Sequence, residues 1–450
     1  MSTLVNVRRC SSHARALLAR PTVAFVLCGS LALQVGLSGI AQAGPARANQ
    51  VTLVFEHQWI GPQEGYLKDV IKRYEQLHPN ITIKESAVAD TTKIITALSG
   101  GKPPDIVDFG LGQFVPELAS KGALTNLDPY IAASHLNMGI YVPASVQVVT
   151  YGGHAYGLPF MNFNHGLLYN RTLFRQAGIA HPPSTLEELQ ADAYRLTKVD
   201  SSGKILQMGF IPDWPGGANG QAVNLVDYAW LFGGGWYNQK SGQLTANSPA
   251  NIKALTWETQ FYRKYGAQNI NNFVKSSGAY LSNDIFASGK LAMCFDGEWW
   301  LDFAPPKFIS QIGSAPFPAP QGLKGLTGTS FIDTNPQVIP AGSAHKQAAF
   351  DFIRWETSDP SVDVSFGKRV FNLPQLKSVP ASAISTDPRF KVFVDIAAGP
   401  NAHVFPRLGY AGEMITKIQN AEASALNGRG SPASVLQALQ SDLQNSASGQ

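Results

Sequence analysis

Charge and long apolar runs are both scarce in this chain of 450 residues. Only 15% of the residues are charged, while 44% are hydrophobic and 10% are aromatic. This balance is that of a globular protein and excludes a disordered, collagenous or coiled-coil chain. Outside the N-terminus, no apolar stretch reaches the roughly 18 residues that a membrane-spanning helix requires. We expect a soluble protein, or one tethered once, with two or three domains of about 150 residues each.

Cysteine is also scarce, with 3 residues in the whole chain. Cys10 and Cys28 fall in the N-terminal segment, which leaves Cys294 alone in the remainder. Removal of that segment excludes an internal disulfide, and a domain of this size does not need one. Cys294 lies in the apolar run 291–295, which predicts a buried strand residue rather than a nucleophile.

An excess of positive charge is absent beyond the first 43 residues. Arg8, Arg9, Arg15 and Arg20 are the only charged residues before position 44, so 31 of the 35 Lys and Arg residues remain against 31 Asp and Glu. This neutral remainder contains no basic run. A protein that neutralises several phosphates needs a surplus of Lys and Arg, so we expect no nucleic-acid partner.

The N-terminus has the three parts of a secretory signal peptide. A basic stretch up to Arg20 precedes an apolar stretch at 23–37, and Ala-Gln-Ala at 41–43 predicts cleavage after residue 43. The alternative is an uncleaved membrane anchor. Cys28 follows the bulky Leu27, which argues against lipid attachment. We expect an exported chain, beginning at residue 44, at the periplasmic or extracellular face of the cytoplasmic membrane.

Motifs of metal-dependent and nucleophilic enzymes are absent. The sequence has no His-Glu-x-x-His, no Gly-x-Ser-x-Gly, and no Gly-x-x-x-x-Gly-Lys after a predicted strand. We therefore expect no metal, no cofactor and no enzymatic activity. A secreted glycoside hydrolase is the alternative from a different class, because Asp296 and Glu298 could form its carboxylate pair. Against it, the eight strand and helix units of a barrel enzyme cannot be counted.

Strands and helices alternate after the signal peptide. Residues 51–55, 81–83 and 105–109 are short apolar strands, separated by helical periodicity at 66–77 and 94–98. This alternation predicts an α/β fold with mainly parallel sheets covered on both faces. Ligands of such sheets bind beyond the carboxyl ends of the strands. The residues that follow the strands are the first site candidates: Gln58, Trp59 and Phe109.

Later helices begin at recognisable capping residues. Ser184 and Thr185, each with a glutamate three residues later at Glu187 and Glu188, predict a capping box and a helix through Leu196. Ser248 followed by a proline predicts a helix that ends at Gly266.

Four blocks of short motifs occur in order along the chain. They are His-Pro-Asn-Ile at 78–81; Ser-Gly-Gly-Lys-Pro-Pro-Asp-Ile-Val at 99–107; Tyr-Gly-Leu-Pro at 156–159 with Leu-Tyr-Asn-Arg at 168–171; and Phe-Ala-Ser-Gly-Lys-Leu-Ala-Met at 286–293 with Asp-Gly-Glu-Trp at 296–299. Behind a signal peptide, this order resembles the extracellular solute-binding proteins, family 1, of carbohydrate-type ABC importers, which include maltose- and multiple-sugar-binding proteins. The resemblance extends from about Val51 to beyond Tyr410.

This resemblance implies a two-lobe, type II periplasmic-binding-protein fold, in which each lobe is a mainly parallel sheet flanked by helices and the ligand lies in a cleft between the lobes. The expected division is residues 44–158 and 306–342 in lobe I, and 159–305 and 343–450 in lobe II. The chain would cross between the lobes near residues 156–162, near Pro305 and near Pro340. Hinged closure over a ligand fits this arrangement.

A carbohydrate site needs flat aromatic rings for the apolar faces of the sugar, and amide or carboxyl groups for its hydroxyls. Trp299 is the leading candidate, because the matching family position stacks on the ligand; the alternative is that Trp300 points inward. Trp230 and Trp236 flank a glycine cluster, and one of them is expected to be core. The polar candidates, with the neighbouring tyrosine, are Asn162, Asn164, Asn224, Asp227, Asp296, Asp333, Arg407 and Tyr410.

The function implied is the capture of a mono- to oligosaccharide and its delivery to the permease subunits of an ABC transporter by a monomeric binding protein. If Arg407 faces the ligand, an anionic ligand such as glycerol phosphate, or another polyol, becomes the alternative; Arg407 could equally form a structural ion pair. Asp296 could instead cap the turn before Trp299. A receptor that signals without transport is a third alternative.

Overall fold

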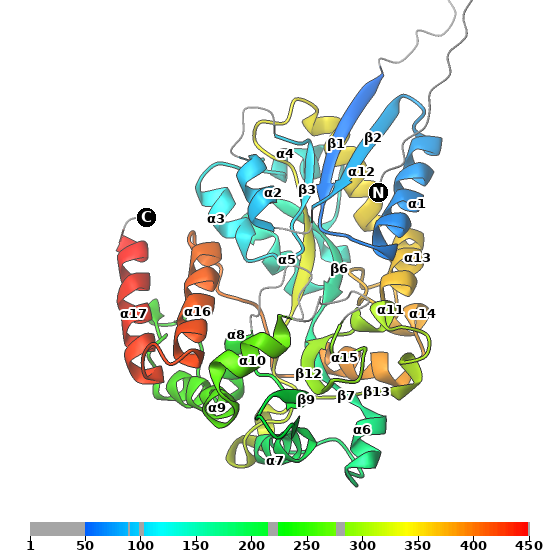
Figure 1. Cartoon of the computed structure of the whole chain (residues 1–450). Coiled ribbons are helices and arrows are strands. Elements are labelled where there is room, and N and C mark those ends of the chain that lie inside the picture. Colours follow the sequence, from blue (N-terminus) through cyan, green and yellow to red (C-terminus); the bar gives the residue numbers. More distant parts are fainter. Residues whose placement is uncertain (1–49, 89–90, 99–102, 215–223, 276–283, 449–450) are drawn as a thin grey trace, which may run out of the picture. The chain divides into compact units, whose positions relative to one another are not determined.

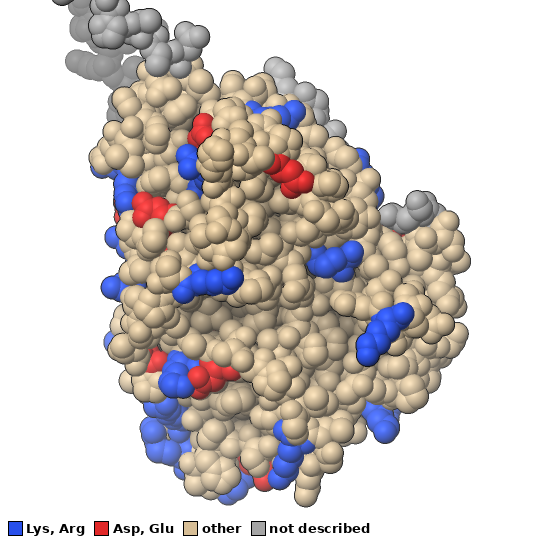
Figure 2. Space-filling model, turned by 180° about the vertical axis from the view of Figure 1, so that it is seen from behind, with Lys and Arg blue, Asp and Glu red and all other residues tan. Residues whose placement is uncertain are grey.

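The computed structural model describes residues 50–88, 91–98, 103–214, 224–275 and 284–448 (Figure 1). The predicted signal peptide, residues 1–43, lies outside these described residues. Within them, no helix combines the length and the apolar character needed to cross a membrane. On the face shown in Figure 2, Lys and Arg are spread among uncharged residues with a few Asp and Glu between them, as expected from the balanced charge of the sequence.

The first sheet has five strands in the order β2-β1-β3-β15-β6. β1 pairs in parallel with β2 and β3, whereas β15 runs antiparallel to β3 and β6. The strands are β1 (Val51–His57), β2 (Ile81–Ala87), β3 (Ile106–Asp108), β6 (Gly157–Phe163) and β15 (Asp333–Val338). The helices that connect these strands or follow them are α1 (Pro62–Leu77), α2 (Thr91–Leu98), α3 (Phe114–Ser120), α4 (Asp128–Ala133), α5 (Pro143–Val148), α12 (Lys346–Ser358) and α13 (Pro360–Val370).

The second sheet also has five strands, in the order β13-β7-β12-β9-β8. The strands are β7 (His165–Asn170), β8 (Lys198–Val199), β9 (Ile205–Phe210), β12 (Leu291–Gly297) and β13 (Ile312–Ala315). The remaining α-helices are α6 (Arg171–Gln176), α7 (Leu186–Leu196), α8 (Asn224–Leu231), α9 (Pro249–Tyr265), α10 (Ala267–Val274), α11 (Trp300–Phe303), α14 (Ala381–Ile384), α15 (Pro388–Ala398), α16 (Ala411–Leu426) and α17 (Pro432–Ser448).

Three two-stranded pairs complete the β structure of the described residues. They are β4 (Thr150–Tyr151) with β5 (His154–Ala155), β10 (Tyr237–Asn238) with β11 (Gln243–Leu244), and β14 (Ser330–Phe331) with β16 (Ala402–His403). Short 3₁₀ helices lie at Met138–Ile140, Ile309–Gln311 and Gln321–Leu326.

The capping residues that the sequence predicts begin their helices in the structure. The Thr185 side chain accepts a hydrogen bond from the Glu188 backbone N at 3.2 Å, directly before α7. Ser248 accepts one from the Asn251 N at 3.2 Å before α9, which ends at Gly266 with a positive φ of 83°. Both bonds satisfy backbone donors that the first helical turn leaves without an intrahelical partner.

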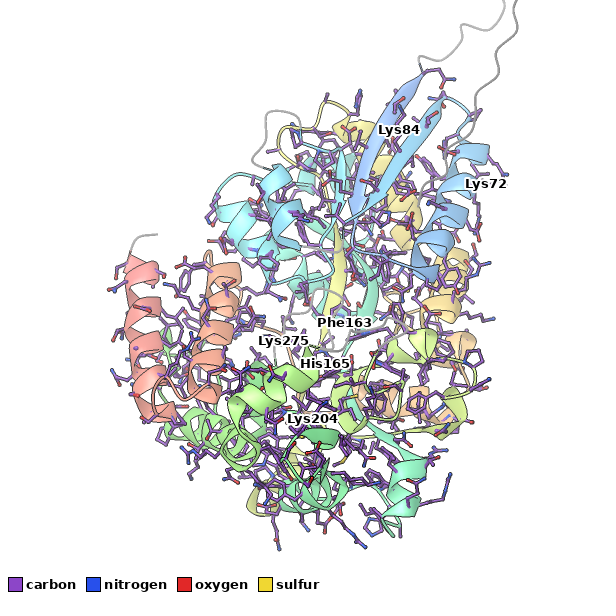
Figure 3. All side chains as sticks on the ribbon, in the orientation of Figure 1. Lys72, Lys84, Phe163, His165, Lys204 and Lys275 are labelled. Atoms are coloured by element: carbon purple, nitrogen blue, oxygen red, sulfur yellow. The ribbon has the colours of Figure 1, made fainter. Side chains whose placement is uncertain are left out.

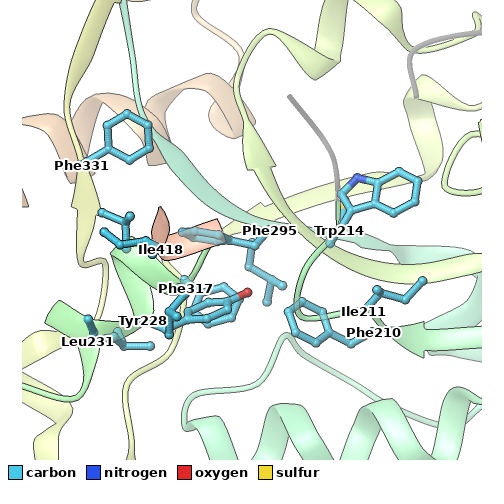
Figure 4. Packing of buried hydrophobic residues seen from close by; sticks show 14 of the residues in the cluster. Phe210, Ile211, Trp214, Tyr228, Leu231, Phe295, Phe317, Phe331 and Ile418 are labelled. Carbon is cyan, nitrogen blue, oxygen red and sulfur yellow. The ribbon is translucent and has the colours of Figure 1, made fainter. Parts of the chain in front are cut away.

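An aromatic core supports the second sheet (Figure 4). Phe317 lies against Phe295, Tyr228 and Phe210, with ring centroids 4.6, 5.5 and 5.9 Å apart. Cys294, on the same strand as Phe295, is a buried free thiol as predicted. This packing holds β12 in place, and β12 ends at the turn before Trp299.

The predicted α/β architecture is confirmed, and the pairing within the sheets is mixed. The predicted strands pair in parallel, β1 with β2 and with β3. The second sheet has one parallel pair among its described strands, β9 with β12. In the first sheet β15 runs antiparallel to β3 and β6. In the second sheet β7 runs antiparallel to β12 and β13, and β8 runs antiparallel to β9.

The chain passes between the sheets at places that differ in part from the prediction. β6 belongs to the first sheet and β7 to the second, so the first crossing lies at 163–165, just beyond the expected 156–162. Near Pro305 there is no crossing, because β13, which follows, pairs with β7 in the second sheet. The return lies instead at 331–333, between β14 and β15.

The segment after Pro340 also departs from the expected division. α12 and α13 contribute to the hydrophobic cluster of the first sheet, where Phe352 packs on Phe55 of β1 at 5.9 Å. Figure 1 shows α12, in yellow, beside the blue β1. The chain turns to the second sheet only after α13, and α15 packs against β13 and β7. A helix with one apolar face does not specify which sheet it covers, and this explains the difference.

Candidate functional site

Aromatic rings gather where the chain first crosses between the sheets. Phe163, the last residue of β6, makes edge contacts with Trp299 at 5.4 Å and Phe331 at 6.1 Å. His165, the first residue of β7, contacts the same two rings at 5.6 and 4.8 Å. Figure 3 shows Phe163 and His165 together at this crossing. The two crossing segments, 163–165 and 331–333, therefore meet through their side chains.

Asp227 of α8 ties the two crossing segments together. One carboxylate oxygen, Oδ1, accepts a hydrogen bond from the Phe331 backbone N at 2.6 Å. The other, Oδ2, lies 3.3 Å from Nδ1 of His165. Burial raises the pKa of Asp227, and the bond and charge of His165 oppose this rise. The second segment is held directly as well, because the His165 N donates to Ser330 Oγ at 2.8 Å.

Trp230 extends the group of rings on the side of β16. Its indole stacks on His403 with centroids 4.7 Å apart and planes 19° apart, and it stays half-buried. Burial lowers the pKa of His403, while the charge of Asp227 opposes this effect. Trp236 is the core residue of the predicted pair, since it is 1% exposed and donates from Nε1 to the Val226 carbonyl at 3.3 Å.

Trp299 and Trp300 differ in burial, and only Trp299 stays partly exposed. Trp300 is buried between Phe286 and Phe308, so it belongs to the core. Trp299 stays half-buried and lies over the backbone of Gly297, where an added Cβ would be 1.8 Å from Cζ3 of the indole. Glycine at position 297 is therefore required for this orientation of Trp299.

We name this group of six rings the aromatic row. It combines residues from both crossing segments, from the turn between β12 and α11, from α8 and from β16. Its members are Phe163, His165, Trp230, Trp299, Phe331 and His403.

Asn162 precedes the crossing and Asn164 lies within it, and each side chain donates to a backbone carbonyl of a later segment. The Asn162 side chain accepts from Ser145 Oγ at 2.7 Å and donates to the Pro374 carbonyl at 2.9 Å. The Asn164 side chain donates to the Phe393 carbonyl at 2.9 Å. Both amides thus join the crossing to the segment that follows α13.

Glu298 lies beneath the crossing and is fully buried. Its carboxylate accepts from the Asn164 N at 3.4 Å and from Asn372 Nδ2 at 3.1 Å. Burial raises the pKa of Glu298 to about 8, although these hydrogen bonds oppose the rise. The arrangement links the first crossing to the segment after α13 through a second path.

The candidates on the first sheet lie mostly inside its core. Trp59 is 2% exposed, makes edge contacts with Phe160 and Phe366, and donates from Nε1 to Asp108 Oδ2 at 2.9 Å. Burial raises the pKa of Asp108 to about 7. In this structure the Trp59 ring therefore offers no open face.

Gln58 and Phe109 border this buried group. Gln58 is partly buried and donates from Nε2 to Asn335 Oδ1 at 3.0 Å. Phe109 has no exposed surface and belongs to the larger hydrophobic cluster.

Asp333 and Arg407 share one charged environment near α3. Asp333 accepts from the Gly112 N at 3.1 and 3.2 Å, and burial raises its pKa to about 7 while the charge of Arg407 opposes the rise. The Arg407 guanidinium donates to the Thr150 carbonyl at 3.1 and 3.3 Å and to the Gly112 carbonyl at 3.1 Å. Burial lowers the pKa of Arg407 to about 9. The guanidinium of Arg407 therefore donates these hydrogen bonds to backbone carbonyls of the protein itself.

The last three candidates have local structural contacts. Asn224 donates to the Pro212 carbonyl at 2.7 Å and so holds the turn after β9. Asp296 accepts from the Gly297 N at 2.8 Å, as expected of a residue that caps the turn. Tyr410 is buried, and its carbonyl accepts from Met414 N at the start of α16.

The residues of the row that the sequence does not mark as ligand candidates are Phe163, His165, Phe331 and His403. Glu298, which supports the crossing, enters the sequence analysis only as a carboxylate of the alternative hydrolase. The signal that could mark Phe163 and His165 is their position on either side of Asn164, which the sequence places just after the predicted crossing. The pairing of β14 with β16 brings Phe331 opposite His403, and no local pattern predicts this contact across the chain. Among the described residues, no group of three or more His, Cys, Asp or Glu side chains could hold a metal ion.

A sequence profile of the family described as bacterial extracellular solute-binding protein matches residues 61–362, more than half of the chain. The chain belongs to this family. The maltotriose-binding protein of Pyrococcus abyssi is 22% identical to it over 377 residues, which cover 79% of this chain and 73% of the relative. The mannitol-binding protein of Pseudomonas aeruginosa is 26% identical over 319 residues, 69% of this chain and 68% of the relative.

Solved structures of solute-binding proteins have the same fold. The structure of CpMnBP1 with mannotriose bound matches with a TM-score of 0.77 and 31% identity, covering 87% of this chain and 99% of that one. An ABC transporter solute-binding protein from Thermotoga lettingae, bound with α-D-tagatose, matches with a TM-score of 0.75 and 22% identity, covering 88% and 99%. This family member therefore has the predicted two-lobe, type II periplasmic-binding-protein fold.

Proposed function

We propose that this family member is the carbohydrate-binding component of an ABC importer, which captures a neutral sugar against the aromatic row and delivers it to permease subunits. The observation that carries the proposal is the aromatic row itself. Its rings come from both crossing segments, so a ligand on them would contact the part of the chain that links the two lobes. Movement of the lobes about these segments would then depend on the ligand.

The chemistry of the row suits a sugar. The C–H faces of a sugar pack on aromatic rings, and the contact removes a large, flat apolar surface from water. Trp299 and Trp230 are the two half-buried indoles of the row, and Asp227 lies beside it as a hydrogen-bonding group. Stacking supplies most of the affinity in this proposal, and the polar groups supply the orientation.

A neutral ligand is favoured over glycerol phosphate. Arg407, the candidate cation, donates its hydrogen bonds to two backbone carbonyls and faces the charge of Asp333. The relatives named for maltotriose and mannitol, and the structure with mannotriose, are also consistent with neutral carbohydrates. We therefore take a mono- to oligosaccharide or a sugar alcohol as the ligand class.

The remaining elements of the proposal follow from the sequence. The protein is exported by a signal peptide at residues 1–43, acts as a monomer and carries out no catalysis. Asn162 and Asn164 support the crossing beneath the row. The other residues that the sequence predicts stay predictions for the ligand-bound form: Gln58, Trp59, Phe109, Asn224, Asp296, Asp333, Arg407 and Tyr410.

A thermal-shift screen of the mature chain, residues 44–450, tests the proposal. The panel contains mannobiose, mannotriose, maltotriose, mannitol and glycerol 3-phosphate. A ligand at 100 times its Kd stabilises the folded state by about 2.7 kcal/mol. With an unfolding entropy of about 2.1 cal/mol/K per residue, this raises the Tm of a chain of this size by about 3 °C.

Trp299→Ala should abolish the shift, because it removes the leading ring of the row. Trp355→Ala is the matched control, since Trp355 is a half-buried indole on α12 that packs on Tyr74 and Phe352. The control should lower Tm and keep the ligand shift. An unchanged shift in the Trp299 variant contradicts the site, a shift with glycerol 3-phosphate alone supports the anionic alternative, and turnover of a glycan supports the hydrolase.

A further inference from the structure

The two ring nitrogens of His165 have different surroundings. Nδ1 faces Oδ2 of Asp227 at 3.3 Å. Nε2 has no hydrogen-bond partner among the described residues, and it is not fully shielded from solvent. The residue as a whole is only 8% exposed. One nitrogen is thus committed to the protein, and the other is open to a ligand.

The imidazole of His165 lies among aromatic rings. The rings of Phe295, Trp299 and Phe331 surround the imidazole at centroid distances of 5.2, 5.6 and 4.8 Å. A hydrogen bond in such an apolar environment is stronger than in water, and a polar atom left there without a partner is costly. A ligand that stacks on Trp299 would bring its hydroxyls to the edge of this imidazole.

We propose that His165 is a specificity-determining residue, whose Nε2 accepts a hydroxyl proton of the bound sugar while Asp227 holds the imidazole in the Nδ1–H form. This inference rests on the proposed function and names a contact within the same site. A phosphate or carboxylate oxygen has no proton to donate to Nε2 and would lie near the carboxylate of Asp227. The pair therefore selects neutral, hydroxyl-bearing carbohydrates over anionic ones.

Asp227 acts as a positioning residue in this scheme. An ionised carboxylate can only accept hydrogen bonds, so Oδ2 requires a proton on Nδ1 of His165. Oδ1 is engaged by the Phe331 N at 2.6 Å, which fixes the carboxylate in place. The charged groups that act on Asp227 are His165 and His403, and neither Lys nor Arg is among those acting on it within the described residues. Nearby, Glu298 is directed away, toward Asn164 and Asn372.

His165→Phe tests the contact, because it keeps an aromatic ring for the packing and removes both nitrogens. The probes are mannobiose, mannotriose and maltotriose, measured by titration calorimetry on the mature chain. We expect affinity to fall at least tenfold for the sugar that binds the wild type. His165→Gln, whose side-chain oxygen can also accept, should recover part of the affinity and serves if the Phe variant does not fold.

The structure offers a matched control in a second histidine–aspartate pair. His154 Nδ1 lies 2.6 Å from Asp128 Oδ2, and both side chains are exposed. His154→Phe should therefore leave sugar affinity unchanged. A similar loss in this control would show that the effect at His165 is not specific to the site.

Asp227→Asn tests the positioning role through the tautomer of the His165 imidazole. Loss of a purely structural contact would leave this tautomer unchanged. The amide introduced by this substitution would donate to Nδ1 of His165, so the imidazole proton moves to Nε2. Nitrogen-15 NMR of the imidazole should show the Nδ1–H form in the unliganded wild type and the Nε2–H form in the variant, which should also bind sugar at least tenfold more weakly. An Nε2–H form in the wild type overturns the proposal.

Failure of the inference and failure of the proposed function give different results. If the wild type binds no sugar of the panel, the proposed function fails. If the wild type binds a sugar and His165→Phe binds it equally well, only the role of His165 is refuted.

Discussion

Two buried glutamates form a carboxyl pair between α9 and α16. Glu258 is fully buried and Glu422 is 2% exposed. Burial is the main cause that raises the pKa of both groups, in Glu422 to about 8, and the negative charge of Asp213 adds to the effect. We predict that Glu422→Gln makes the protein more stable than the wild type at pH 8, and hardly changes its stability at pH 5.

The sign and size follow from proton linkage. An acid with a higher pKa in the folded state binds more protons when folded, so stability falls as pH rises between the unfolded and folded values. For Glu422 this window runs from the ordinary value of 4.5 to about 8. The slope is about 1.4 kcal/mol per pH unit wherever the folded chain holds a proton that the unfolded chain has lost, so the loss across the window amounts to several kcal/mol. Glutamine cannot ionise, and its oxygen can still accept from the Leu225 N.

Urea unfolding at pH 5, 6, 7 and 8, followed by tryptophan fluorescence, measures the effect. The difference between variant and wild type should grow steadily with pH and reach several kcal/mol at pH 8. Glu413→Gln on the same helix is the control, because its hydrogen bond to Lys417 lowers the pKa of Glu413 instead. Parallel stability curves for the Glu422 variant and the wild type would refute the assignment of this pair.

Three further substitutions probe the site and its support. Trp230→Ala removes the ring stacked on His403 and should weaken sugar affinity about tenfold by titration calorimetry; an unchanged Kd would place the ligand elsewhere. Gly209→Ala would set a Cβ 2.0 Å from the Ala193 carbonyl oxygen and should cost about 2–4 kcal/mol in urea unfolding, unless α7 shifts freely. Ser145→Ala removes the 2.7 Å bond to Asn162 and should cost about 1–2 kcal/mol with sugar affinity retained; a loss of affinity would give Asn162 a role in binding.

Local features of this chain could be predicted from its sequence. Helix starts at Thr185 and Ser248 depend on one side chain and the following turn, and both agree with the structure. The short strands β1 to β3 also lie where apolar runs bounded by turns predict them. Such signals are contained within a few neighbouring residues, so they do not require knowledge of the rest of the chain.

Contacts between distant segments could not be predicted in the same way. Trp59 follows a strand as a ligand residue would, but its indole N–H binds the buried Asp108. Trp230 and Trp236 flank the same glycines, and only the packing of α8 distinguishes them. The return of the chain at 331–333 likewise depends on the pairing of β15 with β3 and β6. β15 is short and mostly polar, so its sequence does not predict this pairing.

The strand that crosses between the sheets explains why sequence reasoning came within one residue of the aromatic row. Successive side chains of a strand point to opposite sides, so a shift of one position exchanges the two faces. Asn162 and Asn164 lie on one side and bind backbone carbonyls of the segment 372–393. Phe163 and His165 lie on the other side and contact the rings of the row. If sugar binds on the aromatic row as proposed, the same extended segment holds the crossing with its amides and contacts the ligand with its aromatic side, so sugar affinity should depend on the geometry of the crossing.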